Sequence, residues 1–437
     1  MAETRSLRDP IHGFIKLTEN DAKIIDTPLF QRLRRIKQLA LAYLVYPGAL
    51  HSRFEHSLGV FEVAGRMALK LGLSQDEIRL VKEAALLHDL GHGPFSHVSE
   101  TILELYGEGN EGNVEKIEKE KIHEKLTHQI IQTHPDLDRP LSRDQRMDIV
   151  KILSENDRSP ILKSIITGPL DADKQDYLLR DSYYCGVKYG IFDLDQLQRE
   201  MCSIPDVAGE HYLMVDNDGV NSLEQYILAK YYLTNQVYRH RVRLITDEMI
   251  VRAVVLGIEE DNLDWLYNIY HYESTDKYMG EYLKWDDNEI FSRALEEKNR
   301  STLVYNIMLR IQNRHLFKRV YHKVLGDAFN AKEKQILQTI MRPEKKETRS
   351  LLESQLCQNI EKECQNLGIA FDVTDIRSAV KNRYVILNVF QVKSVKSQST
   401  EDESEIMIHL ANNKYRRFEI ESSLFRSINE KMNEYHV

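Results

Sequence analysis

The chain has 437 residues, of which 42% are hydrophobic and 29% are charged, and its formal net charge at pH 7 is −9. At roughly 100–200 residues per domain, this length predicts two or three globular domains with ordinary cores. The negative net charge argues against a global basic surface for nucleic acid or anionic membranes. Because no apolar run approaches the ~18 residues of a membrane span and the N-terminus lacks a signal-peptide core, we expect a cytoplasmic protein without membrane partners.

The chain begins with a short hairpin or extended arm, followed by a helix. Residues 5–18 alternate weakly and turn at His12, which we expect to be a structural or surface group. Residues 26–39 show helical periodicity, with Asp26 or Thr27 as the N-cap. We therefore expect one continuous helix in this segment.

Two further helices are predicted at residues 53–71 and 75–90. Their apolar stripes contain His56 and His88, so both histidines should face the core. Asp89 lies about 100° around the second helix from His88. An ion bound by both residues would sit beside that helix.

The second helix ends in the stretch HDLGHGPFSH, residues 88–97, which concentrates histidines unusually. The adjacent His88 and Asp89 offer one neutral nitrogen and one anionic oxygen, a pair that suits a divalent first-row metal. The glycines and the proline end the helix and turn the backbone. This turn places His92 and His97 beyond the metal-binding residues.

The rest of the chain is mostly helical in period, up to about residue 368. Residues 100–125 are highly charged, and we expect most of this segment to be a surface insertion. The last segment contains alternating stretches that predict strands, with a turn at residues 412–414. We expect a mostly α protein with four parts: an N-terminal hairpin or arm (1–20), a metal-binding core (21–200), a helical extension (201–365) and a C-terminal α+β lobe (366–437).

Two ligands do not complete a metal site, because a borderline ion takes at least four donors, some of them water. His56 and Asp173, which opens a helix at residues 171–185, are the additional candidates. Histidine ligation favours manganese, iron, nickel, cobalt or zinc, and a second ion, magnesium, on phosphates is equally compatible.

Several motifs in fixed order carry a family resemblance. They are DPIHGFIKL, DTPLFQRLRRIKQL, HSRFEHS, HDLGHGPFSH, His123-Glu124 and DADKQDYLLRDS. This series resembles the HD-domain deoxynucleoside triphosphate (dNTP) triphosphohydrolases, from about Arg8 to about Val242. The resemblance implies that the core is an HD-domain helical core. It also implies metal-dependent cleavage of dNTPs to deoxynucleoside and intact triphosphate.

The resemblance also assigns roles to individual residues. It makes the metal ligands His56, His88, Asp89 and Asp173, and it places around the α-phosphate His92, His97 and His123. We expect His97 to protonate the leaving oxygen, with His123 close by. The implied substrate shell comprises Arg53 and Lys174 at the polyphosphate and Gln38, Tyr177, Asp181 and Tyr238 at the sugar.

Two positions depart from the family pattern. Lys230 stands where an arginine is expected at the terminal phosphate, which keeps the charge but loses the bidentate fork. Arg239 stands where a glutamine is expected near the base. Both departures bear on the preference for base and sugar.

A regulatory site is also implied. Asp26, Gln31 and Arg34 match positions that bind an activating guanine nucleotide, GTP or dGTP, at a subunit interface in some family members. Such an effector implies a homo-oligomer, a dimer or tetramer, whose states differ in affinity for it. The alternative is a helix cap and a solvated face. The basic run at residues 32–37 keeps nucleic acid as a less favoured partner.

Three functions follow from these observations. A metal-dependent dNTP triphosphohydrolase is the leading hypothesis. Another HD-type phosphodiesterase or nuclease is the second. A nucleotide-sensing protein that binds without turnover is the third.

Overall fold

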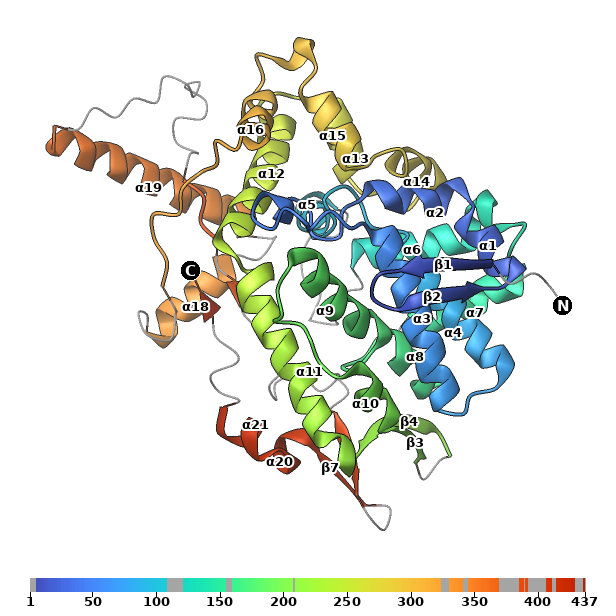
Figure 1. The fold of residues 1–437 in the computed structure, drawn as a ribbon. Helices are drawn as coiled ribbons and strands as arrows, with labels where there is room; N and C mark the ends of the chain where they lie inside the picture. The colour runs from blue at the N-terminus through green and yellow to red at the C-terminus, as the bar shows by residue number, and fades with distance from the viewer. Residues whose placement is uncertain are drawn as a thin grey trace.

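The computed structural model describes residues 5–107, 121–154, 159–206, 209–323, 330–340, 345–368, 385–388, 390–391, 406–410, 414–428 and 435–436. Within these ranges helices predominate, and the strands form three small sheets (Figure 1). The predicted mostly α fold is therefore confirmed.

The chain begins with an antiparallel hairpin, as predicted. Strands β1 (Arg5–Asp9) and β2 (Gly13–Leu17) pair in a register that sets Asp9 opposite Gly13. Gly13 has φ +77°, a backbone conformation that glycine adopts without the usual steric cost. Helix α1 (Glu19–Ile25) follows behind a capping box formed by Thr18 and Asp21.

The predicted continuous helix over residues 26–39 is wrong. Helix α2 ends after one turn (Pro28–Gln31), and a 3₁₀ segment, η1 (Arg32–Arg35), replaces the expected continuation. The predicted cap is correct, because the Thr27 side chain accepts from the Phe30 N–H. Where the helix gives way to the 3₁₀ segment, the buried Arg32 turns inward and donates to the carbonyls of His92 and Trp285.

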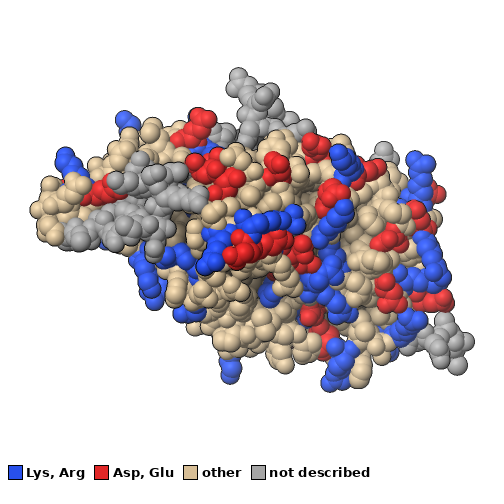
Figure 2. Space-filling model, turned by 90° about the horizontal axis from the view of Figure 1, so that it is seen from above, with Lys and Arg blue, Asp and Glu red and all other residues tan. Residues whose placement is uncertain are grey.

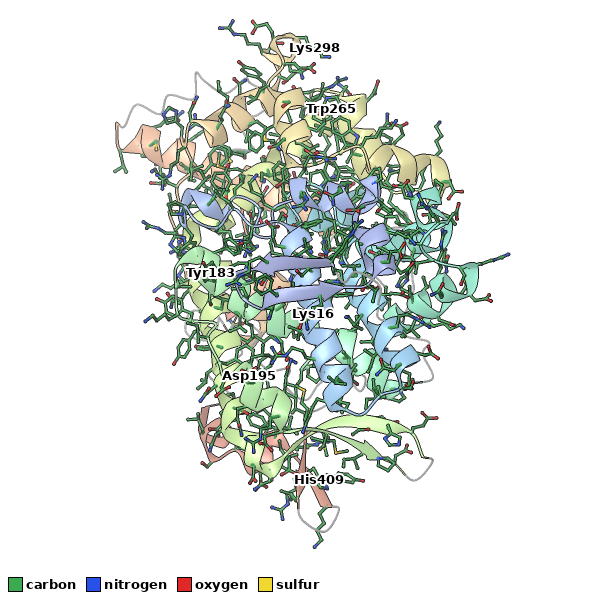
Figure 3. The ribbon with its side chains drawn as sticks, turned by 45° about the vertical axis from the view of Figure 1, so that its right-hand side comes forward. Lys16, Tyr183, Asp195, Trp265, Lys298 and His409 are labelled. Carbon is green, nitrogen blue, oxygen red and sulfur yellow. The ribbon has the colours of Figure 1, made fainter. Side chains whose placement is uncertain are left out.

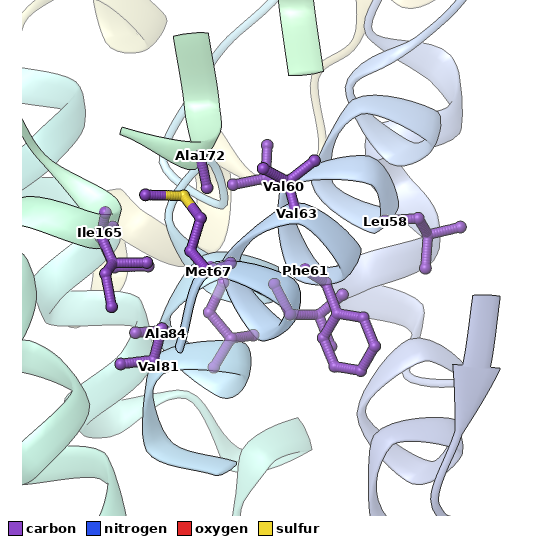
Figure 4. Packing of buried hydrophobic residues seen from close by; sticks show 14 of the residues in the cluster. Leu58, Val60, Phe61, Val63, Met67, Val81, Ala84, Ile165 and Ala172 are labelled. Atoms are coloured by element: carbon purple, nitrogen blue, oxygen red, sulfur yellow. The ribbon is translucent and has the colours of Figure 1, made fainter. Parts of the chain in front are cut away.

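Two helices of the core form where the sequence predicted them. They are α3 (Arg53–Lys70) and α4 (Gln75–Leu87), each of which begins at a capping box. The helices pack against each other, and Met67 of α3 lies among Val81 and Ala84 of α4, Ile165 and Ala172 (Figure 4). This packing fixes the faces from which His56 and His88 project.

The other core helices surround this pair. They are α5 (His97–Tyr106), α6 (Ile122–Thr133), α7 (Arg143–Leu153), α8 (Pro160–Ile166), α9 (Ala172–Cys185) and α10 (Leu194–Arg199). The extension contains α11 (Val220–Leu233), a π-helical turn η5 (Thr234–Tyr238), α12 (Arg241–Glu259), α13 (Asp264–Tyr270), α14 (Asp276–Tyr282), α15 (Asp287–Ala294), α16 (Leu303–Gln312), α18 (Ala331–Ile340) and α19 (Lys346–Asn366). Short 3₁₀ turns are η2 (Ala42–Leu44), η3 (Pro135–Leu137), η4 (Asn217–Gly219) and η6 (Glu297–Asn299).

Distant parts of the chain build one four-stranded sheet. Its order is β3 (Met201–Pro205), β4 (His211–Asp216), β6 (Met407–Leu410) and β7 (Lys414–Arg417), with β4 and β6 parallel. Helices α20 (Phe418–Glu421) and α21 (Ser423–Ile428) follow, and β5 (Phe390–Gln391) pairs with β8 (Tyr435–His436). The strand predicted at 370–377 and Asn412 and Asn413 of the predicted turn lie outside the described residues.

The buried apolar residues form two clusters. One joins α3, α4, α7, α8 and α9, and the other joins α5, α12, α13 and α16. None of the helices described is both long and apolar enough to cross a membrane. On the face drawn in Figure 2, basic and acidic side chains are interspersed, so this face presents no continuous basic surface.

Candidate active site

Three predicted metal ligands from three helices converge on one point. His56 lies on α3, His88 caps the C-terminus of α4, and Asp173 lies in the first turn of α9. One donor atom from each residue lies within 4.8 Å of the others. The Asp173 Oδ1 atom is 2.9 Å from His56 Nε2 and 3.9 Å from His88 Nε2. Donors about 2.0–2.2 Å from a shared ion would have spacings of this order.

The fourth predicted ligand, Asp89, borders this cluster. Its Oδ1 lies 3.3 Å from His88 Nε2, and its Oδ2 lies 3.8 Å from His56 Nε2. The same carboxylate pairs closely with the Arg53 guanidinium. Asp89 therefore lies between the metal cluster and the Arg53 guanidinium, which lines the neighbouring cavity.

The hydrogen bonds of the two histidines fit a metal. The Nδ1 of His56 is 2.8 Å from Asp176 Oδ2, and the Nδ1 of His88 is 2.7 Å from the Ala85 carbonyl. Because these oxygens act as acceptors, each Nδ1 carries a hydrogen, and each Nε2 is the nitrogen left to face an ion. Among the described groups, neither buried Nε2 has a hydrogen-bond partner. The residues present thus fit a divalent ion.

The electrostatic surroundings of His56 favour positive charge. Burial alone would lower the pKa of His56, but the nearby carboxylates of Asp173 and Asp176 outweigh burial and raise it to about 10. A divalent cation would satisfy the same carboxylates.

The predicted phosphate-side histidines form a second group. The rings of His92 and His123 stack with centroids 4.1 Å apart, and the His97 ring lies 5.6 Å from that of His92. Burial, together with the nearby Arg53, lowers the pKa of His92 well below its ordinary value. Burial also lowers the pKa of His123 to about 4. Both rings are therefore neutral at neutral pH.

Sequence reasoning missed Glu100, which joins this second group. Its Oε2 lies 3.2 Å from His97 Nδ1 and 3.6 Å from His123 Nδ1, and its Oε1 lies 2.8 Å from Lys121 Nζ. Burial opposes ionisation, but the two histidines hold the pKa of Glu100 well below its usual range. Glu100 is an exception to the expectation that most of the charged run at residues 100–125 is a surface insertion. The available signal was the i, i+3 spacing from His97, which sets both side chains on one helix face.

Arg53 faces the cavity from the first turn of α3. Its Nε donates to Ser96 Oγ at 2.9 Å, and its Nη1 contacts Asp89. Its Nη2 is buried without a hydrogen-bond partner in the described part of the chain. A buried donor without an acceptor is costly, so this nitrogen suits an anionic ligand.

The turn that carries Ser96 is strained. Phe95 and Ser96 have φ values of 62° and 55°, a region that non-glycine residues rarely adopt. Asp287 of α15 accepts from the Phe95 N–H at 2.7 Å, and Ser96 Oγ donates to the Lys37 carbonyl at 2.7 Å. These contacts hold the strained turn and with it the Arg53 side chain.

The predicted sugar-binding residues also cluster. Asp181 accepts from Tyr238 Oη at 2.5 Å and lies 2.7 Å from His51 Nε2. Tyr177 packs edge-on against Tyr238, and burial raises the pKa of both phenols, so both hydroxyls stay neutral. The buried Gln38 Oε1 has no hydrogen-bond partner within the described ranges.

These groups line one cavity of about 1070 Å³. The predicted site residues on its wall are Gln38, Arg53, His88, Asp89, His92, His97, His123, Asp173, Lys174, Tyr177, Asp181, Lys230, Tyr238 and Arg239. His56 reaches the same place through the metal cluster. The structure thus brings together all the predicted metal, catalytic and substrate residues.

The predicted effector residues lie elsewhere, on the surface. Asp26 is exposed and pairs with Arg5 at 3.2 Å. Arg34 is exposed, donates to Gln31 Oε1 at 2.8 Å, and places its guanidinium 3.4 Å from the centroid of the Phe54 ring. These side chains form a polar surface separate from the described cavity wall.

Two family models match this chain, and several known proteins are similar to it. The HD domain model matches residues 53–182, and the HD associated region model matches residues 192–436. An uncharacterized Bacillus subtilis protein, YwfO, is 32% identical over 73% of this chain and 72% of its own length.

An uncharacterized protein of Methanocaldococcus jannaschii is 39% identical over 59% of this chain and 51% of its own length. Human SAMHD1, named a deoxynucleoside triphosphate triphosphohydrolase, is 32% identical over 56% of this chain and 44% of its own. The chain thus spans only about half of each of these two relatives.

Solved structures share the fold. A phosphohydrolase from Bacteroides thetaiotaomicron has a TM-score of 0.72 at 23% identity, covering 99% of both chains. A hypothetical protein from Aquifex aeolicus has a TM-score of 0.67 at 26% identity, covering 99% of this chain and 95% of its own.

Proposed function

Because this chain belongs to the HD-domain family with an HD associated region, we propose that it is a metal-dependent dNTP triphosphohydrolase. The observation that carries this proposal is the position of the metal-type cluster on the wall of the cavity. The same wall holds Arg53, Lys174 and Lys230, which suit a polyphosphate. The name of the SAMHD1 relatives supports a dNTP as substrate.

The cluster of His56, His88, Asp89 and Asp173 would hold the divalent ion. Such an ion supplies Lewis-acid polarisation of a phosphoryl oxygen and lowers the pKa of water. The neighbouring Arg53 binds the phosphates through its Nη2. The same guanidinium pairs with Asp89, which borders the metal cluster. Lys174 and Lys230 bind the outer phosphates from α9 and α11.

The reaction we propose breaks the bond between the α-phosphorus and O5′. A water oxygen bonds to the α-phosphorus and releases a proton to solvent, from which His97 regains the proton that it gives to the leaving group. O5′ leaves with the nucleoside, so the products are deoxynucleoside and intact triphosphate. O5′ takes its proton from His97, with His123 close by, and Glu100 holds both rings.

The sugar side fixes the nucleoside. Asp181 accepts from the 3′-hydroxyl, while the neutral hydroxyls of Tyr177 and Tyr238 and the amide of Gln38 surround the ring. Arg239 faces the base from the end of η5. Because Lys230 and Arg239 depart from the family pattern, the preferred base and sugar are to be measured on this chain rather than carried over from the family.

The test is a product-resolved assay with the four dNTPs and varied metals (Mn²⁺, Fe²⁺, Co²⁺, Ni²⁺, Zn²⁺ and Mg²⁺). We expect tripolyphosphate and deoxynucleoside in equal amounts. Release of orthophosphate or a nucleoside monophosphate would overturn the proposal. Cleavage of an oligonucleotide or cyclic nucleotide with inert dNTPs would indicate another HD-type hydrolase, and dNTP binding without any product would indicate a sensor.

We also propose that Asp26, Gln31 and Arg34 bind GTP or dGTP as an effector of a homo-oligomer. The exposed Arg34 and its neighbour Gln31 offer donors to guanine or its phosphates, and Asp26 offers an acceptor. Titrating either nucleotide into the assay should raise the rate or change the oligomer size. An unchanged rate and size at millimolar effector would contradict this part of the proposal.

A further inference from the structure

The tip of the N-terminal hairpin reaches the metal cluster through buried hydrogen bonds. His12 Nε2 lies 2.7 Å from Asp176 Oδ1, and Asp176 Oδ2 lies 2.8 Å from His56 Nδ1. The side chains of all three residues are at most 1% exposed. His56 then presents its other nitrogen to the cluster. The hairpin carrying Lys16 lies against α3 and α9 (Figures 1 and 3).

A second set of contacts holds both ends of this hydrogen-bonded series, which runs from His12 through Asp176 to His56 and is called the relay below. Arg180 donates to both oxygens of Asp176, at 2.8 and 2.9 Å, and to Asp9 Oδ2 at 2.8 Å. Asp9 Oδ1 accepts from the backbone N–H groups of Ile11 and His12, each at 2.8 Å. Asp9 therefore shapes the turn that aims His12, while Arg180 ties that turn to α9.

The relay is also tightly packed. A Cβ added at Gly59 of α3 would stand 1.9 Å from Asp176 Oδ1 and 2.4 Å from Arg180 Nη2. Only glycine leaves room for the carboxylate to approach the α3 backbone this closely. The two oxygens of Asp176 face the nitrogens of His12 and His56 and the guanidinium of Arg180, so the carboxylate accepts hydrogen bonds from all three.

We propose that His12 is a positioning residue of the metal centre, acting through Asp176 on the ligand His56. His12 and His56 each bond a different oxygen of Asp176, so His12 and Arg180 together hold the carboxylate that orients the His56 ring. Without His12, Oδ1 keeps only its bond from Arg180, and the carboxylate can shift toward the guanidinium and lengthen its bond to His56. The sequence-based expectation that His12 is a structural or surface group misses this role.

The inference rests on the metal centre of the proposed function and is independent of the substrate. Its test is a Mn²⁺ titration followed by the electron paramagnetic resonance signal of the free ion. We expect His12→Ala to weaken Mn²⁺ binding by ~10–100-fold, the usual effect of losing an outer-shell partner. His12→Gln, whose amide nitrogen can donate to Asp176, should recover much of the affinity.

Phe14→Ala is the matched control, because Phe14 lies on the same hairpin and is 61% exposed. It should bind Mn²⁺ as the unaltered protein does. Melting temperatures of the metal-free proteins report on hairpin packing alone. Unchanged affinity in His12→Ala would overturn the inference, and so would an equal loss in His12→Ala and His12→Gln. An unaltered protein that binds no metal would instead overturn the proposed metal centre, and the inference with it.

Discussion

The two histidine groups of the cavity hold the same side chain in opposite surroundings. His56 lies among carboxylates that favour positive charge, whereas His92 and His123 lie beside Arg53 and Lys121 in a buried stack. The first group turns its Nε2 atoms toward a common point, and the second keeps neutral rings on the cavity wall. The difference teaches that surroundings decide the charge of a histidine: carboxylates outweigh burial at His56, whereas burial, helped by Arg53 and Lys121, prevails at His92 and His123.

Removing a carboxylate from the metal group should have the largest effect. Asp173→Asn keeps the shape but removes the anionic oxygen that lies 2.9 Å from His56 Nε2. We expect metal content and triphosphate release both to fall to background, as measured by elemental analysis and the product-resolved assay. Asp195→Asn, at an exposed position on α10, should change neither. Full metal content in Asp173→Asn would show that this carboxylate is not needed for metal binding and would contradict the separate roles of the two groups.

Altering the second group should slow the reaction without releasing the metal. Glu100→Gln removes the charge that holds His97 and His123, and we expect kcat to fall by about 10²-fold. The control is Glu104→Gln, one turn further along the same helix face, which removes an equal charge from an exposed side chain. A variant at Glu100 that loses its metal would show that the two groups act as one.

The smallest expected effect concerns stability against pH in the metal-free protein. The pKa of His123 in the fold is about 4, below the ordinary 6.5, so its contribution to stability is complete above pH 6.5 and is lost as pH falls toward 4. Between pH 7.5 and 5 we expect a loss of about 2 kcal/mol from this residue, at 1.36 kcal/mol per pKa unit.

Urea unfolding at both pH values measures this loss. His123→Gln cannot take up a proton and should lose correspondingly less stability over the same range, while His92 titrates in both proteins. Equal losses in the two proteins would mean that His123 is not held neutral in the fold.

The local parts of the fold could be predicted from the sequence. Helices α3 and α4 begin at capping boxes, and their apolar periodicity turned His56 and His88 inward. Such signals lie within a few turns of chain, where spacing alone determines which side chains share a face. The metal cluster needed Asp173 as well, which the sequence offered as a candidate at the start of a helix and the family resemblance then assigned as a ligand.

The parts that failed depend on contacts between distant residues. Arg32, at the point where the helix predicted at residues 26–39 gives way to a 3₁₀ segment, bonds Trp285, 253 positions away. His12 meets Asp176 across 164 positions, and Glu100 enters the site from a run that reads as solvated. Periodicity carries no information about such pairs, because a charged side chain follows the same pattern whether it faces water or a buried partner.

The parallel pairing of β4 with β6 has a consequence for biosynthesis. Asp216 and His409 face each other across 193 positions, so β4 leaves the ribosome long before its partner strand exists. At ~5–20 residues per second, the edge of β4 waits ~10–40 s for β6. An uncovered strand edge is a template for pairing with another chain. During this interval the edge of β4 is open to such pairing, and the arrival of β6 closes it.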